Sequence, residues 1–460
     1  MKPTTLDAYS LLHRGTLALS QVEANGIRID VDYLTEARSR TQRKVLELEE
    51  ELRQSDAWKL WRKRFGAKAN LRSRSQLGDV LFKDLKFTST KQTKGGKPKV
   101  DEDVLGSIDF PFVQSYLRME KLKKADATFL SGIEQETVNG FLHAMFDLNT
   151  ARTFRSSSSR PNFQNFPIRD PELGKLIRRC FVPRPGRVLV EIDYGSIEVR
   201  VAACYHKDPV MLEYIHDTSK DMHRDMASQI YCCEPGQVSK KMRYAAKNQF
   251  VFPQFYGSYW AQCAPALWDF IAKFSLAVDD KIPVKRWLRD HGIKRLGEVP
   301  DHGDPCKGTF YRHVQEVERD FWGRRFRVYD QWKKDWYSAY LRDGGFTSLT
   351  GFRIDGMMSR NDVINYGIQG SAFHCLLWSL IRLQREIRRR KMKTKIVGQI
   401  HDSLLADVPE DELDDWLALA KEVMTEEIRR EWGWIIVPLT IEAEVGRRSW
   451  HDKKPVEIGA

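Results

Sequence analysis

Two aspartates at strand ends are the residues of this sequence best suited to chemistry. The stretch "KIVGQIHDSLLADV", residues 395–408, is two apolar runs that meet at His401 and Asp402, which indicates a buried hairpin with Asp402 at its tip. The stretch "RVLVEID", residues 187–193, alternates along an expected strand and ends on Asp193. Carboxylates from two separate strands are the oxygen ligands that a pair of Mg2+ ions requires, and two such ions can hold both the attacking and the leaving oxygen of a phosphoryl transfer.

A cationic and aromatic helix is expected in "RYAAKNQFVFPQFYG", residues 243–257. Arg243 and Lys247 lie four residues apart, on one face, where like charges repel by about a few tenths of a kcal/mol. A bound triphosphate would reverse the sign of that interaction. The aromatic residues that follow offer surfaces on which a base can stack; they are Phe250, Phe252, Phe255 and Tyr256.

Each of these features also has an ordinary structural explanation. A strand-end aspartate commonly forms a turn or caps a helix, and two cations on a helix commonly extend into solvent. The combination of two strand-end carboxylates, a cation pair and an aromatic cluster favours nucleotidyl transfer.

Composition indicates a folded protein with a polyanionic partner. The chain has 460 residues, 42% of them hydrophobic, and a formal charge of +12 that is spread along its whole length. Such a distribution favours a long polyanion lying across two to four subdomains. An odd number of cysteines, 7, without CxxC spacing predicts reduced thiols in a reducing compartment. No run of 18 apolar residues and no leader pattern occurs, so we expect a protein of the cytoplasm that does not enter a membrane.

The expected elements are helices, strands and two polar stretches. Residues 32–54 predict a long helix with Asp32 as its N-cap, and residues 314–340 have helical spacing of apolar side chains. The segment "KFTSTKQTKGGKPKV", residues 86–100, has five Lys and no acid, which predicts an exposed loop that either contacts phosphate or is an ordinary surface loop. The Ser-, Asn- and Pro-rich residues 150–167 indicate a loop or domain junction, whereas the sequence does not organise residues 258–310.

Several segments resemble a known family in the right order. "DYGSIEVR", "RYAAKNQFVFPQFYG" and "HDS" resemble motifs A, B and C of family A DNA polymerases, the bacterial DNA polymerase I type. "TFRSSSSRPNFQNFP", "DMHRDMA", "NYGIQGSA" and "VPLTIEAEVGRRSW" are similar to further segments of the family, and "VEANGIRIDVDYL", "NLRSRSQLGDVLF" and "YLRMEKLKK" resemble its thumb. The resemblance covers nearly the whole chain apart from residues 258–310.

The resemblance implies an α+β fold of the right-hand polymerase type, with an antiparallel palm sheet and helical thumb and fingers. The implied divisions are a thumb at 1–145, a palm at 146–218 and 355–460, and fingers at 219–354 with an insertion near 258–310.

The resemblance also implies a role for individual residues. Catalysis would fall to Asp193, Asp402 and Lys247, and two Mg2+ ions would be held by Asp193, the backbone carbonyl of Tyr194, and Asp402. The incoming nucleotide would be bound by Arg243, Lys247, His223, Glu198, Tyr256 and Phe252. Glu198 occupies the family's sugar-gate position, where a carboxylate leaves no room for a 2'-hydroxyl. Primer and template would be contacted by Arg155, Gln164, Asn365, Gln369 and His401, several of them at the minor-groove edge.

The sequence departs from the family pattern at three places. Ser403 follows Asp402 where the family usually has Glu, so a carboxylate is missing near the expected metals. The spacing from Lys247 to Tyr256 is one residue longer than usual. Phe252 therefore shares a face with Lys247 only if a π-bulge absorbs the extra residue, and otherwise Phe250 or Val251 would stack on the base. Finally, Ser196 replaces a family Gln and Pro253 a family Gly.

The sequence therefore predicts a template-directed DNA polymerase that adds dNTPs to a primer 3'-end in DNA replication. We expect no 3'-5' exonuclease in this chain. A separate exonuclease or processivity subunit is an expected partner. We also expect a phage or mobile-element origin, with activity in the host cytoplasm. One alternative is a single-subunit RNA polymerase, which Glu198 opposes. The other is a catalytically inactive, polymerase-like DNA-binding subunit, to which Ser403 gives some support.

Overall fold

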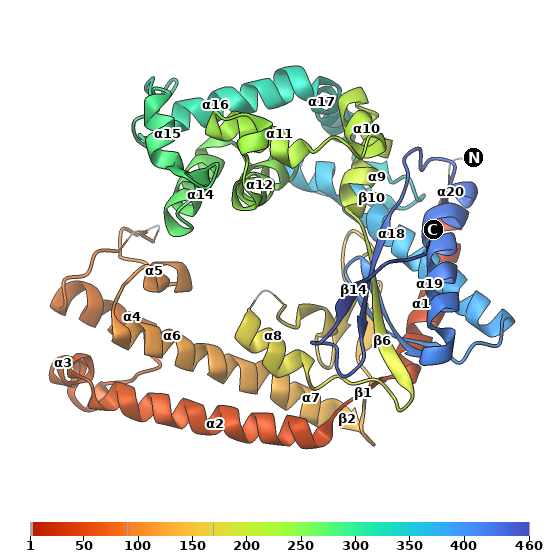
Figure 1. The fold of residues 1–460 in the computed structure, drawn as a ribbon, viewed down its shortest axis with the longest axis horizontal. Coiled ribbons are helices and arrows are strands. Elements are labelled where there is room, and N and C mark those ends of the chain that lie inside the picture. The colour runs from red at the N-terminus through yellow and green to blue at the C-terminus, as the bar shows by residue number, and fades with distance from the viewer. Residues whose placement is uncertain (1–2, 90, 94, 169, 460) are drawn as a thin grey trace.

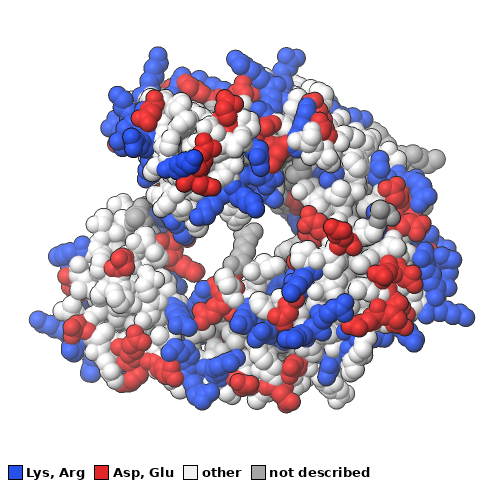
Figure 2. All heavy atoms as spheres, viewed as in Figure 1, with Lys and Arg blue, Asp and Glu red and all other residues white. Residues whose placement is uncertain are grey.

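The chain forms three parts around a central opening, and a gap at the same place is visible when all heavy atoms are drawn (Figures 1 and 2). The computed structural model describes residues 3–89, 91–93, 95–168 and 170–459. A helical arm lies on one side of the opening and a helical block on the other, and an antiparallel sheet joins them. This is the expected α+β right hand, with a thumb, fingers and palm.

The palm sheet brings the two chemically suggestive stretches together. Its strand order is β11-β12-β6-β13-β14, and every neighbouring pair is antiparallel. The strands are β6 (Arg187–Tyr194), β11 (Lys395–Ile400), β12 (Ser403–Pro409), β13 (Ile441–Gly446) and β14 (Lys454–Val456). The predicted strand and the predicted hairpin are both present, and they are adjacent although more than 200 positions separate them in the sequence.

Alternation along β6 determines which face each side chain meets. Val190 and Ile192 are buried in a core shared with the palm helices, whereas Leu189 is buried in a second core shared with the thumb. Each fully buried aliphatic side chain contributes about 1.5–3 kcal/mol. Because successive side chains of a strand point to opposite faces, Glu191 and Asp193 project to the same face as Leu189.

Three helices cover the face of the palm sheet to which Val190 and Ile192 point. They are α1 (Thr5–Asn25), α18 (Arg360–Arg389) and α19 (Leu413–Lys421). The helix α1 lies within the residues expected to form the thumb, yet Ala8, Leu19 and Val22 are buried in the palm core with α18. A capping box between Thr4 and Asp7 fixes the start of α1. The smaller elements beside this core are α20 (Ile428–Glu431), β9 (Gly345–Thr347) and β10 (Arg353–Asp355).

The thumb is built on two long helices that pack along each other, α2 (Val31–Gln54) and α6 (Pro111–Lys124). The helix expected at 32–54 is present, but its N-cap is Asp30, not Asp32. The Asp30 carboxylate accepts a hydrogen bond from the Tyr33 backbone N–H at 3.0 Å, and Asp32 lies in the first turn. Shorter elements complete the thumb: α3 (Asp56–Phe65), α4 (Arg74–Gly78), α5 (Glu102–Gly106), α7 (Ser131–Glu136) and strands β1 (Ile27–Arg28), β2 (Thr137–Val138) and β3 (Phe141–Leu142).

The fingers are helical and include the region that the sequence did not organise. Their helices are α11 (Met222–Tyr231), α12 (Lys240–Ala246), α13 (Phe252–Phe255), α16 (Phe310–Asp320) and α17 (Arg327–Asp343). The helix α10 (Pro209–His216), at the end of the first palm segment, packs into the same core through Met211. Residues 258–310 form α14 (Trp260–Lys273), a hairpin of β7 (Ala277–Val278) and β8 (Ile282–Pro283), and α15 (Val284–Asp290). In the described part of the chain, no helix combines the length and the apolar character needed to cross a bilayer.

The Ser-, Asn- and Pro-rich stretch forms the junction between thumb and palm. It contains β5 (Ser157–Ser159), which pairs with β4 (Met145–Asp147), and it leads into α8 (Pro171–Arg178). Phe163 and Phe166 anchor the stretch because both rings are buried against Trp450 and Phe181 in the core shared by thumb and palm. The polar composition therefore belongs to a loop that is held firmly by its aromatic residues.

Candidate active site

Asp193 and Asp402 lie beside each other at the end of the palm sheet. Asp193 pairs directly with Ser403, the residue after Asp402. The backbone N–H of Tyr194 donates to the carbonyl oxygen of Asp402 at 3.2 Å. The two-residue turn of the β11-β12 hairpin carries His401 in a left-handed conformation with φ of 50°, and this turn sets Asp402 next to β6.

The environment of Asp193 and Asp402 disfavours the ionised form of both carboxyl groups. Burial, followed by the negative charge of Asp402, raises the pKa of Asp193 to about 8, and burial raises the pKa of Asp402. Oδ1 of Asp193 is buried and has no hydrogen-bond partner among the described residues. A divalent cation would neutralise this pair, so the donor set fits Mg2+, which takes one or two carboxylates together with water and substrate phosphates.

Tyr194 can take part in such a site only through its backbone. Its side chain is buried in the palm, where the hydroxyl contacts Ser379 Oγ at 2.9 Å and donates to the Met424 carbonyl at 2.9 Å. These contacts anchor the end of β6 and leave the main-chain carbonyl of Tyr194 beside Asp193 as the possible ligand.

Glu198 is held by contacts from two other elements. It lies in the first turn of α9 (Ile197–His206), which follows a turn at Ser196 with φ of 52°. The Tyr256 hydroxyl donates to Glu198 Oε2, and Arg155 Nη1 donates to Oε1 at 3.4 Å. Glu198 follows Asp193 by five residues, across the turn at Ser196, and after burial its charge contributes to raising the pKa of Asp402.

The fingers residues predicted to bind a triphosphate also cluster. Arg243 donates from Nε to Asp221 at 2.5 Å, and Asp221 caps α11, the helix that carries His223. Burial, and then the charges of Lys247 and Arg243, lower the pKa of His223 to about 4, so this imidazole is neutral at pH 7. His223 Nδ1 is buried without a partner in the part of the chain that is described.

The extra residue after Lys247 is absorbed by a π-helical turn, Lys247–Val251. Phe250 and Val251 are fully buried in the fingers core. Phe252 instead lies with Lys247, whose Nζ is 5.1 Å from the centre of the ring, and it meets His223 edge to face at 5.7 Å. Of the alternatives that the spacing left open, the geometry therefore favours Phe252, which is half-buried, as the aromatic residue beside the cations.

A small cavity of about 30 Å³ connects the fingers with the palm. Its lining includes five of the predicted site residues: Glu198, Phe252, Tyr256, Asn365 and Gln369. The last two belong to the N-terminal part of α18, and Asn365 donates to the Tyr256 carbonyl at 3.4 Å. The structure thus brings together residues predicted from three separate segments.

Gln164 and His401 belong to a polar network that sequence reasoning missed. Gln164 Nε2 donates to Gln399 Oε1 and to Ser156 Oγ, both at 2.8 Å. Gln399 Nε2 in turn donates to the His401 carbonyl at 2.8 Å. The sequence signal that could have indicated this network is Gln399, a polar residue in the mainly apolar strand "KIVGQI". The side chain of Gln399 is only 1% exposed, and a buried amide needs hydrogen-bond partners.

Ser403 lies in a second network, at the position where a carboxylate was expected. Its hydroxyl contacts Glu191 Oε1 at 3.2 Å and the Ile400 carbonyl at 3.1 Å. The Glu191 carboxylate also accepts from Trp450 Nε1 at 2.7 Å and from Lys453 Nζ at 2.6 Å. A buried carboxylate with a paired ammonium therefore lies on β6, two residues before Asp193.

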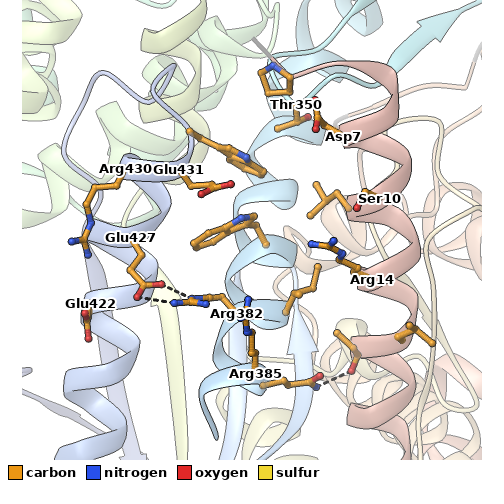
Figure 3. Close-up of a pocket in the computed structure, with 18 of the residues that line it drawn as sticks. Asp7, Ser10, Arg14, Thr350, Arg382, Arg385, Glu422, Glu427, Arg430 and Glu431 are labelled. Carbon is orange, nitrogen blue, oxygen red and sulfur yellow. Dashed lines mark hydrogen bonds and ion pairs between the residues drawn. The ribbon is translucent and has the colours of Figure 1, made fainter. Parts of the chain in front are cut away.

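A much larger cavity, about 980 Å³, lies elsewhere, between α1, the C-terminal half of α18 and the residues around Glu427 (Figure 3). An ion pair of Arg382 and Glu427 at 2.6 Å crosses part of it. It shares no lining residue with the smaller cavity beside Glu198. Cavity size alone would have pointed away from the carboxylate pair.

Comparisons with known proteins agree with this geometry. The sequence profile of DNA polymerase family A matches residues 31–267 and 353–452. The chain is 29% identical over 454 residues to DNA polymerase I of Chloroflexus aurantiacus, covering 96% of this chain and 43% of that protein. It is 30% identical over 446 residues to the thermostable DNA polymerase I of a Thermus thermophilus strain, covering 93% and 46%. The chain thus spans less than half the length of these relatives.

A solved structure has the same fold. The POL domain of Pol1 from M. smegmatis, in complex with DNA primer-template and dNTP, superposes with a TM-score of 0.72 and 25% identity, covering 95% of this chain and 70% of that chain. The matched profile accounts for both strands of the carboxylate pair, the cationic fingers helix and the N-terminal half of α18. The chain therefore belongs to DNA polymerase family A.

Proposed function

We propose that this chain is a template-directed DNA polymerase that adds dNTPs to the 3'-end of a primer during DNA replication. The observation that carries the proposal is the adjacency of Asp193 and Asp402, next to a Glu198 that contacts the fingers through Tyr256. The primer-template and dNTP bound to the related Pol1 domain are consistent with a DNA substrate in the central opening. The proposed divisions are a thumb at 1–145, a palm at 146–218 and 355–460, and fingers at 219–354, with α1 packed on the palm.

Asp193, Asp402 and the Tyr194 carbonyl are the proposed ligands of two Mg2+ ions. The ions, when bound, would supply charge neutralisation at the triphosphate and lower the pKa of the primer hydroxyl. The protein contributes two carboxylates that repel each other when both are ionised, and bound cations would offset that repulsion. Among the described residues, no three His, Cys, Asp or Glu side chains converge as a metal site, which fits a site completed by substrate phosphates.

The proposed triphosphate site is the group of Arg243, Lys247 and His223. Asp221 holds Arg243 in place at 2.5 Å, so the guanidinium is positioned before any nucleotide arrives. A neutral His223 can donate one hydrogen bond to a phosphate oxygen without adding charge. Lys247 is the proposed proton donor to the departing pyrophosphate, and Phe252 beside it offers a face for the base.

Sugar and base-pair selection are proposed for the residues between fingers and palm. Glu198, held by Tyr256 and Arg155, would fill the space that a 2'-hydroxyl needs. Minor-groove acceptors of the primer and template would be contacted by Arg155, Gln164, Asn365 and Gln369, and the primer terminus by His401.

A primer-extension assay tests this proposal. The wild-type chain with Mg2+ should extend a labelled primer with dNTPs and not with rNTPs, and Asp402→Asn should lower the rate at least about a hundredfold while still binding primer-template. Extension with rNTPs alone would favour an RNA polymerase. DNA binding without incorporation of any nucleotide by the wild-type chain would favour an inactive DNA-binding subunit.

A further inference from the structure

Three aromatic rings form a row on the fingers, in which the outer two are exposed and the middle one is half-buried. Tyr244 on α12 lies 6.0 Å from Phe270 on α14, and Phe270 lies 4.3 Å from Phe274, with angles of 35° between the ring planes in both pairs. Tyr244 is 56% exposed and Phe274 is 40% exposed. Large apolar side chains on a surface in such close succession commonly mark a binding site.

The row is held in place by buried neighbours. Ile271 and Leu276, on either side of Phe274, are 2% and 3% exposed and belong to the fingers core. The helix α14 ends at Lys273, and Ser275 has a left-handed backbone with φ of 48° that turns the chain back into the core. The rings therefore form a rigid platform that needs no ordering when a ligand binds.

Lysines lie at both ends of the platform, and one exposed carboxylate, Asp269, lies next to Phe270. Lys241 lies one helical turn before Tyr244, on the same face, and Lys273 Nζ lies 5.7 Å from the Phe274 ring. Lys241 and Lys273 are exposed, and neither forms an ion pair with any residue that the structure describes. In Figure 2, Lys and Arg side chains gather on the edge of the fingers that faces the opening.

The lysine-rich thumb loop approaches the same edge. In Figure 1 the loop between η2 (Asp79–Asp84) and α5 lies next to the free end of α14. The pKa of Lys91 is raised, first by its hydrogen bond to Asp103 and to a smaller degree by the charge of Asp269 on α14. The loop and the platform therefore lie within electrostatic range of each other, and the loop adds the exposed Lys97 and Lys99.

We propose that the Tyr244-Phe270-Phe274 platform binds unpaired bases of the DNA template strand, while the thumb loop lysines contact its phosphates. Stacked aromatic faces beside a basic groove are the arrangement that holds single-stranded nucleic acid without reading its sequence. The proposal rests on the proposed polymerase function, which supplies the template. Phe270 and Phe274 lie outside the residues matched by the family profile, so the site is an addition within the fingers.

The template strand is favoured over other occupants for two reasons. Every primer-template has an unpaired template segment, whereas a displaced strand exists only when a downstream duplex is present. A protein partner would also not require cations beside the aromatic rings, whereas a phosphate backbone releases its own condensed counterions when lysines neutralise it.

Overhang binding tests the proposal. The probes are a fluorescent primer-template with a 5' template overhang of ten nucleotides, the same duplex with an abasic overhang, which keeps the phosphates, and a blunt duplex. We expect the wild-type chain to bind the normal overhang about tenfold more tightly than the abasic one, because stacking on one or two rings supplies that preference. Equal affinities for both overhangs would overturn the proposal.

The decisive variants remove the rings. Phe270→Ala/Phe274→Ala and, separately, Tyr244→Ala should abolish the preference for the normal overhang. Phe274→Ala alone serves if the double variant does not fold. Tyr9→Ala is the matched control, because this tyrosine is 66% exposed on α1, and it should keep the preference. A preference for the normal overhang that survives in all ring variants would overturn the assignment.

The same reactions separate this site from the polymerase function. The ring variants should still extend a primer whose template overhang is one nucleotide, because that substrate does not reach the platform. A wild-type chain that binds overhangs with ring-dependent affinity but extends no primer would contradict the proposed function alone. Extension by a wild-type chain that cannot distinguish normal from abasic overhangs would contradict the platform alone.

Discussion

The two aspartates at the end of the palm sheet lower the stability of the fold when they are charged, although the charged form is the one that would bind a metal ion. Burial, and then the negative charge of Asp402, raises the pKa of Asp193. Because the pKa of Asp193 is higher in the folded chain than in the unfolded chain, protonated Asp193 stabilises the fold at low pH. This stabilisation is lost as the pH rises toward about 8. The aspartates therefore destabilise the metal-free chain at neutral and alkaline pH, and a cation would remove that cost.

Asp402→Asn should stabilise the metal-free chain while removing its response to Mg2+. One of two neighbouring negative charges disappears, so the melting temperature at pH 8 without metal should rise by about 2–4 °C for each kcal/mol of relieved repulsion. Thermal unfolding with and without Mg2+ measures both effects. An unchanged Mg2+-induced shift in Asp402→Asn would contradict the assignment of Asp402 as a ligand.

Ser403→Glu should destabilise the chain because Glu191 already occupies the space beside it. The new carboxylate would leave two buried negative charges with one ammonium, Lys453, at a cost of about 3–5 kcal/mol in the free energy of unfolding. Glu191→Gln in the same chain should restore most of the loss. Urea denaturation of the single and double variants gives these values.

Glu444 provides the control for this exchange. It also contacts Lys453, at 2.5 Å, but it has no contact with Ser403. Adding Glu444→Gln to Ser403→Glu should therefore recover less stability than adding Glu191→Gln. Equal recovery would show that total charge, and not the contact of Ser403 with Glu191, determines the cost.

The type and position of single residues predicted the carboxylates but not their partners. Asp193 and Asp402 are readable because each ends an apolar run, and Arg243 and Lys247 because they share a helix face. The partners Gln399 and Lys453 meet Gln164 and Glu191 across more than 200 positions, and that depends on strand pairing that no local pattern encodes. Whether each predicted residue acts as proposed stays a prediction for the assays described.

At the level of elements, the π-helical turn explains how the fingers tolerate their extra residue. Deletion of Asn248, which lies within this turn, should convert it to a regular α-helix and keep Lys247 and Phe252 on one face, because Phe252 would then follow Lys247 by four positions. The variant should stay folded, with a melting temperature within about 5 °C of the wild type. Circular dichroism during heating and primer extension would measure this.

Deletion of Ala245 is the matched control for the π-turn. Ala245 is fully buried in the regular part of α12, so its removal rotates Arg243 away from Asp221 and shifts the apolar face. We expect a much larger loss of stability and of dNTP binding than for the Asn248 deletion. Similar losses in both variants would contradict a π-turn that exists to absorb one residue.

The elements that the sequence missed are those that tertiary contacts stabilise. Pro265 lies inside α14 and interrupts any helical pattern, yet Cys263, Leu267 and Ile271 are buried and hold the helix against the fingers core. The N-cap of α2 was misplaced by two residues because Asp30 and Asp32 have the same capping chemistry. Only the hydrogen bond to the Tyr33 N–H distinguishes them.

Across the whole molecule, buried histidines should make the fold sensitive to acid. Burial lowers the pKa of His206 and of His374 to about 3, whereas an unfolded histidine titrates near 6.5. The unfolded chain therefore binds more protons as pH falls below about 6.5. Each histidine should remove about 2 kcal/mol of stability between pH 7 and pH 5.

His374→Gln tests this sensitivity, because glutamine does not titrate and can accept the hydrogen bond of Thr350. The fall in melting temperature between pH 7 and pH 5 should be smaller in the variant than in the wild type. His13→Gln, on α1, provides the control, and its pH profile should follow that of the wild type. Parallel profiles for His374→Gln and the wild type would contradict the neutral state of the buried ring.

The central position of β6 determines the order in which the molecule can assemble. The thumb helices share a core that draws mainly on neighbouring segments of the chain, so they can condense early. By contrast, β6 gains its two neighbours, β12 and β13, only after the fingers have been synthesised. During translation the strand that bears Asp193 must wait with unpaired edges, and we expect this interval to be when a nascent chain is most prone to aggregation and most dependent on chaperones.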